Sequence, residues 1–211
     1  MNPLLAGCIH DAKNGLGVLG AWLEEARRAA PSPALDEARA IASAVNAQLV
    51  ELLALSRADE GTLRLAIEDH HLGDFCTEVL QDFILPPGGT QRIDAKPVLA
   101  GLHDVAAFDA YQVKMVLHEA LRNALRHGGK NIHLAVAVEG KGGVRFTIGD
   151  DGPGFPRDVL EGKSLAMDSS GSGIGLAFAR LIAERHTIPG GQHGRIELTN
   201  AGGAVFSLIL P

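Results

Sequence analysis

Two stretches near the start of the chain repeat apolar or small residues at alternating four- and three-residue spacings. This spacing places the repeated positions on one face of a helix. The pattern breaks at Pro31-Ser32-Pro33 and then resumes, which predicts two helices joined by a tight turn. The repeated positions are Leu5, Ile9, Ala12, Leu16, Leu19, Leu23, Ala26 and Ala30, then Leu35, Ala38, Ile41, Val45, Leu49, Leu52 and Ser56.

A two-helix hairpin of this kind cannot bury its apolar face by itself. Pairing with a second copy would bury that face in a four-helix bundle. Three glycines inside the first helix, Gly15, Gly17 and Gly20, each cost roughly 1 kcal/mol of helix propensity. Packing in the bundle must offset that cost, and we therefore expect a homodimer.

The pattern changes after the second helix and its short polar linker. An amphipathic helix is predicted within 67–83, beginning near His71 or Leu72, and two more at 110–126 and 174–185. Strands are predicted at 92–99, 132–138, 144–149, 195–199 and 205–210. They do not alternate regularly with the helices, which favours an α+β sandwich of two layers. The predicted domains are a helical hairpin at 1–58, a linker at 59–66 and an α+β domain at 67–211.

Composition narrows the class of protein. The 211 residues are 46% hydrophobic and 21% charged, with a formal net charge of -6, as in a globular protein. Lysine and arginine form no basic run, so no nucleic-acid partner is expected. Charges interrupt the apolar stretches, so we expect no membrane segment. The two cysteines, Cys8 and Cys76, lie far apart in apolar segments, which indicates a reducing compartment and a cytoplasmic protein.

The first chemically informative segment reads EALRNALRH at residues 119–127. Glu119 and Asn123 lie four residues apart on a predicted helix, so their oxygens point the same way and suit one Mg²⁺ ion. Arg126 lies about one turn further, beside His127, where either side chain can meet a phosphate. The segment alone would be an ordinary solvated helix face.

A second segment, DDGPGF, occupies residues 150–155. Asp150 ends an apolar strand, and Gly152 and Gly154 let the backbone turn sharply beside it. The carboxylate is thereby presented to a cavity, where an adenine amino group would suit it. On its own the segment would usually be a surface turn.

The third segment, GSGIGL, occupies residues 171–176. Gly171, Gly173 and Gly175 lead into a helix that begins at Ile174 or Leu176, where free backbone amides suit a polyphosphate. The spacing is not that of a Rossmann dinucleotide loop. The preceding polar stretch, 157–172, is suited to closing over a nucleotide as a lid.

Together and in this order, the three segments resemble the N box and the two glycine boxes of the ATPase superfamily that includes gyrase, Hsp90, MutL and histidine kinases. The resemblance implies a Bergerat-type ATP-binding domain. It implies that Asn123 binds Mg²⁺, that Asp150 contacts adenine, and that the three glycines support the lid and the phosphates. Glu119 stands where many histidine kinases have a second asparagine, which implies a role as metal helper or base.

The hairpin carries a further resemblance. Residues 10–16 read HDAKNGL, which resembles the H box of histidine kinases. It implies that His10 is phosphorylated from ATP, that Asp11 acts as base, and that Asn14 can position water for a phosphatase reaction. The whole chain thus resembles a sensor histidine kinase core, which implies transfer of the phosphoryl group to an aspartate on a response-regulator receiver domain.

Two other interpretations remain open. One is a histidine phosphotransferase with a degenerate ATP-binding domain, against which Asn123, Asp150 and the glycines argue. The other is a serine-directed kinase or plain ATPase of the same superfamily, against which the hairpin histidine argues. No sensor segment precedes His10, so we expect either a longer kinase or a separate sensor protein.

Overall fold

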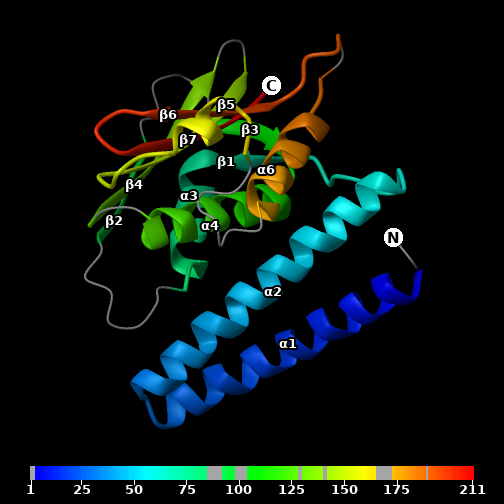
Figure 1. Ribbon diagram of the computed structural model, residues 1–211, viewed down its shortest axis with the longest axis vertical. Coiled ribbons are helices and arrows are strands. Elements are labelled where there is room, and N and C mark those ends of the chain that lie inside the picture. Colours follow the sequence, from blue (N-terminus) through cyan, green and yellow to red (C-terminus); the bar gives the residue numbers. More distant parts are fainter. Residues whose placement is uncertain are drawn as a thin grey trace. The chain divides into compact units, whose positions relative to one another are not determined.

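The computed structural model describes residues 3–84, 92–97, 104–127, 130–139, 142–164, 173–188 and 190–211 (Figure 1). The chain divides into two compact units. One is Met1–Leu63, with which Phe83–Thr90 groups, and the other is Arg64–Asp82 together with Gln91–Pro211. The described part of the first unit is mainly helical, and the second unit contains the sheets.

The first unit is a helical hairpin. Helix α1 spans Pro3–Ala29 and helix α2 spans Pro33–Asp59. Ser32 caps α2, its side chain accepting a hydrogen bond from the Leu35 amide at 3.3 Å, and Pro33 occupies the first turn. Both residues suit a helix start. The Ser32 side chain satisfies a free backbone amide, and proline has no amide hydrogen that would need a partner. The predicted hairpin is confirmed, with its turn at the predicted prolines.

Charged pairs join the two helices of the hairpin. The Arg27 Nε atom lies 2.6 Å from Asp36 Oδ1, and an Arg39 guanidinium nitrogen lies 2.6 Å from Glu24 Oε2. Helix α2 is also long and apolar enough to meet the length and hydropathy of a membrane span. Charges are therefore sparser in α2 than expected. Contact with α1 leaves most of this apolar stretch uncovered, since 33% of it is buried in the structure.

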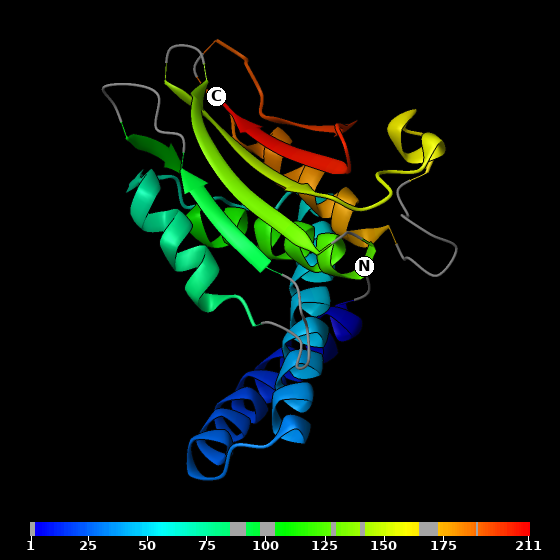
Figure 2. The same cartoon turned by 90° about the vertical axis from the view of Figure 1, so that its left-hand side faces the viewer.

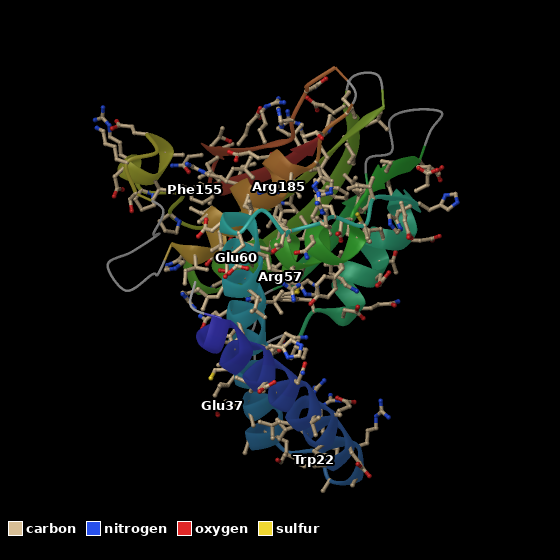
Figure 3. All side chains as sticks on the ribbon, turned by 90° about the vertical axis from the view of Figure 1, so that its right-hand side faces the viewer. Trp22, Glu37, Arg57, Glu60, Phe155 and Arg185 are labelled. Atoms are coloured by element: carbon tan, nitrogen blue, oxygen red, sulfur yellow. The ribbon has the colours of Figure 1, made fainter. Side chains whose placement is uncertain are left out.

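Large apolar side chains remain exposed on both helices of the hairpin. Trp22 on α1 is 65% exposed and Ile41 on α2 is 58% exposed; Trp22 is labelled in Figure 3. Val18, Leu19 and Val45 are also exposed. A single copy of the hairpin thus leaves much of its apolar surface in contact with solvent.

The second unit is built on a five-stranded sheet in the order β2-β4-β5-β7-β6. Strand β2 runs parallel to β4, and the other neighbours are antiparallel. The strands span Arg92–Pro97 (β2), Asn131–Glu139 (β4), Gly143–Asp150 (β5), Arg195–Asn200 (β6) and Ala204–Leu210 (β7).

Three helices pack on one face of this sheet: α3 (Leu72–Asp82), α4 (Ala110–His127) and α6 (Ile174–Arg185) (Figures 1 and 2). Between the layers, the rings of Phe75, Phe108 and Phe146 meet edge to face, with centroids 4.9–5.6 Å apart. Such pairs add to the burial of apolar area. The predicted α+β sandwich of two layers is confirmed.

Three short elements were not predicted. Strands β1 (Glu68–His71) and β3 (Val105–Phe108) form a separate antiparallel pair, and α5 spans Arg157–Leu160. Strand β1 is polar and only four residues long, so it shows no alternation to detect. Helix α5 lies at the start of the predicted lid, of which residues 165–172 are outside the described ranges.

A buried polar cluster fixes the start of α4. Asp109 Oδ1 accepts a hydrogen bond from the Gln112 amide and Oδ2 from the Ala66 amide, both at 2.9 Å. The Asp109 amide donates to His186 Nε2 at 3.0 Å, and His186 Nδ1 donates to the Ile182 carbonyl at 2.7 Å. Burial lowers the pKa of His186, so the neutral ring can both donate and accept.

Candidate functional site

A pocket in the second unit lies between α4, α6 and the strands β5 and β7. It has about 450 Å³ of empty space, part of it open to solvent. Its apolar walls include Val116, Ala120, Ile148, Leu176, Ala179 and Phe206. These residues come from the inner faces of amphipathic helices and alternating strands, so the slot is a continuation of the core. A flat apolar ring would fit such a slot.

Polar groups enter this slot at four places: Glu119 and Asn123 from α4, Asp150 from the end of β5, and the Gly175 backbone at the start of α6. All four were singled out from the sequence, as was Leu176 on the wall. The structure thus brings together candidates from Glu119 to Leu176, which are 57 positions apart along the chain (176 − 119).

Asp150 is fixed in place by backbone amides. Its Oδ1 atom accepts hydrogen bonds from the Gly152 amide at 2.8 Å and from the Ala204 amide at 3.3 Å. Within the part of the chain that the structure describes, Oδ2 accepts none. One carboxylate oxygen is thus held while the other can accept a hydrogen bond from a ligand, as an exocyclic amino group would require.

Glu119, which lines the slot from α4, is restrained by two side chains of its own helix. Its Oε2 atom accepts a hydrogen bond from Arg122 Nε at 3.0 Å, and its Oε1 atom lies 3.3 Å from Asn123 Nδ2. The partner Arg122 was not singled out from the sequence, although it lies three positions from Glu119 on the same helix face. The Asn123 carboxamide thereby points its nitrogen at Glu119 and retains an oxygen for another ligand.

Gly175 allows Glu119 to approach the start of α6. A Cβ atom at residue 175 would lie only 2.6 Å from both Cγ and Oε1 of Glu119. The Glu119 carboxylate therefore lies against the first turn of α6, where free amides and the helix dipole favour negative charge. A phosphate group would be favoured at the same place.

The other described candidates of the second unit are not among the residues that line the slot. Gly173 precedes α6 as its N-cap, and Gly152 supplies the amide that Asp150 accepts. Arg126 and His127 lie in the last turn of α4 and are not among the lining residues. Gly154 takes part in the loop after β5, and Gly171 lies outside the described residues.

Two residues at or beside the slot were given no role in the sequence analysis, although Phe155 ends the DDGPGF segment. Phe155 lines it and is 8% exposed; it follows the β5 loop and is labelled in Figure 3. Asn200, the last residue of β6, hydrogen-bonds to the Phe155 backbone. No local signal could reveal this pair, because 45 residues separate the two partners.

The hairpin holds the remaining candidates. His10 is half-exposed on α1, with its Nδ1 atom 3.5 Å from Asp11 Oδ1 and 3.3 Å from Asn14 Nδ2. A proton on Nδ1 suits Asp11 as acceptor, and the Asn14 carboxamide turned about its axis would accept it too. That tautomer leaves the lone pair on Nε2, which faces no hydrogen-bond partner among the described residues.

A family model for histidine kinase-, DNA gyrase B- and HSP90-like ATPases matches residues 108–211. The match begins at the end of β3 and includes every element that lines the slot. Residues 108–211 are therefore an ATPase domain of this superfamily, and the slot lies within them.

Curated relatives show which class of protein within this superfamily the chain resembles. The signal transduction histidine-protein kinase AfsQ2 of Streptomyces coelicolor is 33% identical over 176 residues, which are 77% of this chain and 30% of that kinase. The sensory histidine kinase/phosphatase NtrB of Escherichia coli O157:H7 is 27% identical over 232 residues, which are 99% of this chain and 61% of that protein. The chain thus spans less than two thirds of either relative.

Solved structures agree on the fold. The Acinetobacter baumannii histidine kinase AdeS superposes with a TM-score of 0.60 at 18% identity, over 92% of this chain and 94% of that one. Full-length ShkA in complex with AMPPNP superposes with a TM-score of 0.68 at 20% identity, over 99% of this chain and 45% of that one. The chain belongs to the sensor histidine kinases and comprises their catalytic core.

Proposed function

We propose that this core transfers the γ-phosphoryl group of ATP to His10 and then to an aspartate on a response-regulator receiver domain. The observation that carries the proposal is one apolar slot that is lined by the Asp150 carboxylate together with the Asn123 and Glu119 side chains. An adenine ring with its amino group suits one end of the slot, and a phosphate chain suits the other. ShkA, whose fold is similar, binds AMPPNP.

In the proposed step, the His10 Nε2 lone pair attacks the γ-phosphorus. A P–N bond forms, the bond from the γ-phosphorus to the β,γ-bridging oxygen breaks, and ADP leaves. The Nδ1 proton passes to Asp11, which lies within 3.5 Å, so the phosphohistidine ends neutral at that nitrogen. Positioning and charge neutralisation supply most of the rate in such transfers.

The donor set around the phosphate end fits Mg²⁺. Carboxamide and carboxylate oxygens are its preferred protein ligands, and it usually takes only one or two of them beside phosphate and water. Asn123 and Glu119 provide such a pair, and the described ranges contain no larger cluster of acidic or histidine side chains. Bound there, Mg²⁺ would neutralise charge on the phosphates, and Arg126 and His127 in the last turn of the same helix would add positive charge.

The partners follow from the class of protein. Histidine kinases generally act as dimers and signal to response regulators, and the exposed apolar residues of α1 and α2 fit a dimeric four-helix bundle. We place the core in the cytoplasm, where ATP and receiver domains are present. The stimulus would arrive through another part of a longer chain or through a separate sensor protein.

The decisive experiment labels the protein with Mg²⁺ and ATP that is radioactive at the γ position. A label that is stable to base and labile to acid is expected in the wild type and lost in both His10→Ala and Asn123→Ala. His10→Ala should still bind ADP, whereas Asn123→Ala should bind it more weakly. His193→Ala is the matched control, because that exposed histidine lies away from the slot.

Each alternative class predicts a different result. A label that persists in His10→Ala would refute the proposed acceptor, and ATP turnover without any label would indicate a plain ATPase. A folded protein that binds no ADP but accepts phosphate from a phosphorylated receiver domain would indicate a phosphotransferase.

A further inference from the structure

The loop between β5 and α5 is held by the β6–β7 hairpin at both of its ends. At the first end, the Ala204 amide donates to Asp150 Oδ1 at 3.3 Å. At the second, Asn200 Oδ1 accepts from the Phe155 amide at 2.8 Å, and Asn200 Nδ2 donates to the Phe155 carbonyl at 3.1 Å. Asn200 and Ala204 are themselves paired across the hairpin.

The Asn200 carboxamide thus bonds to both backbone polar groups of Phe155, the amide and the carbonyl. Only asparagine or glutamine has a donor and an acceptor side by side in this arrangement. A strand end would not need such a clamp to form, since β6 is paired along its length with β7. Its effect falls instead on Phe155, which has no strand or helix to hold it.

Residue 154 is adapted to the same contact. Gly154 has a φ of +85°, which side-chain-bearing residues rarely adopt. A Cβ atom there would also lie 2.7 Å from Cγ and Oδ1 of Asn200. The loop therefore leaves room for the Asn200 side chain at the position directly before Phe155.

The clamped residue is part of the nucleotide slot. Phe155 lines the slot together with Asp150 and Leu176 and is 8% exposed. If its backbone were released, the ring would lose its fixed place on the apolar wall, and the loop after Asp150 would lose its second tie to the β6–β7 hairpin. Ligand affinity depends on such pre-organisation, because ordering a loop during binding costs free energy.

We infer that Asn200 is a positioning residue of the nucleotide site, which fixes Phe155 on the wall of the slot and thereby sets the affinity for the adenine nucleotide. The inference deepens the proposed function and rests on it. Asn200 acts before the chemical step, so its loss weakens binding and leaves the transfer rate at saturating ATP unchanged. The two hydrogen bonds together correspond to roughly a tenfold change in affinity.

The test compares Asn200→Ala with Thr199→Ala, the matched control on the preceding residue of β6, which is also exposed. Calorimetry gives the Kd for ADP, and γ-labelling at varied ATP gives KM and the maximal rate. Asn200→Ala should raise Kd and KM roughly tenfold with the maximal rate within about twofold. Thr199→Ala should match the wild type in all three.

A second variant separates positioning from folding. Asn200→Asp keeps the acceptor for the Phe155 amide but loses the donor. Hydrogen exchange should therefore show the Phe155 amide protected in the wild type and in Asn200→Asp, and unprotected in Asn200→Ala. Far-UV circular dichroism should give the same thermal midpoint for Asn200→Ala and Thr199→Ala to within a few degrees.

The opposite results would overturn the inference. Unchanged Kd and KM in Asn200→Ala, or a fall in maximal rate that matches a general loss of thermal stability, would show that Asn200 does not set affinity. The wild type controls for the proposed function. If it bound no ADP, the nucleotide site and the role of Asn200 would both be refuted, whereas wild-type binding with an indifferent Asn200→Ala refutes only the latter.

Discussion

The two units of this chain treat their large apolar side chains in opposite ways. In the second unit, Phe108, Phe146 and Phe178 have no exposed surface. In the hairpin, Trp22 and Ile41 keep more than half of their surface exposed, at 65% and 58%. A sheet covered by helices closes a core within one chain, whereas two helices side by side bury only the strip where they touch.

The same contrast holds for the polar groups of the proposed reaction. Asp150 and Glu119 are each held by two hydrogen-bond partners before any ligand arrives. His10 is half-exposed, and its hydrogen-bond partners among the described residues are Asp11 and Asn14 on α1. The slot is thus pre-organised, whereas His10 is accessible. In the proposed reaction His10 must meet first a nucleotide and then a receiver domain, and it needs that access.

The largest expected effect comes from the core of the second unit. Phe146→Ala removes a ring that contacts Phe75 and Phe108 edge to face, and we expect it to lower the free energy of unfolding by about 3–5 kcal/mol. Urea denaturation followed by far-UV circular dichroism measures this change. Ile188→Ala, at a residue that is 43% exposed, should stay within about 0.5 kcal/mol of the wild type.

The single tryptophan lets the Phe146→Ala variant also test whether the two units unfold independently. Trp22 is the only tryptophan of the chain and lies in the hairpin, so its fluorescence reports on that unit alone. If Phe146→Ala shifted the fluorescence transition as far as the dichroism transition, the hairpin would depend on the core of the second unit, and the contrast drawn above would fail.

A smaller effect is expected from the hairpin's exposed apolar surface. Trp22→Ser should raise the dissociation constant of the dimer roughly tenfold or more, because a twofold interface contains the change twice. Sedimentation equilibrium measures it, with Ala21→Ser as the control on the adjacent exposed position. Equal dissociation constants for the two variants would show that this surface is not the interface.

The sequence predicted the long elements and the polar ends of the slot, because both leave local patterns. The hairpin appeared as a helical repeat, and Glu119, Asn123 and Asp150 lay in short motifs. What it did not predict depends on distant pairing. Strands β1 and β3 are short and pair across more than 30 residues, and the contact of Asn200 with Phe155 spans 45.

The apolar repeat also predicted a face without showing which part of it one chain would bury. Leu19, Ile41 and Val45 belong to the predicted face, yet all three are exposed in a single hairpin. A repeat along one helix gives the side on which contacts form and not the number of partners that form them. Partner number is a property of packing between chains, which local spacing does not encode.

The smallest expected effect is a pH dependence that belongs to the second unit. Burial lowers the pKa of both His118 and His186, whereas an unfolded histidine titrates near pH 6.5. Above about pH 6.5, the two histidines are neutral in both the folded and the unfolded chain, so the free energy of unfolding should not depend on them. Below it, the unfolded chain binds the protons first, so the free energy of unfolding falls as pH falls.

Each histidine adds a slope of at most about 1.4 kcal/mol per pH unit, measurable by urea denaturation between pH 7.5 and 5.5. His186→Gln removes one titrating group but keeps an amide that can donate or accept, so its slope should be about half that of the wild type. His193→Gln, at an exposed residue, should keep the full slope. A slope that His186→Gln left unchanged would show that burial in the folded protein does not lower the pKa of His186. Trp22 fluorescence should show no comparable dependence, because neither buried histidine belongs to the hairpin.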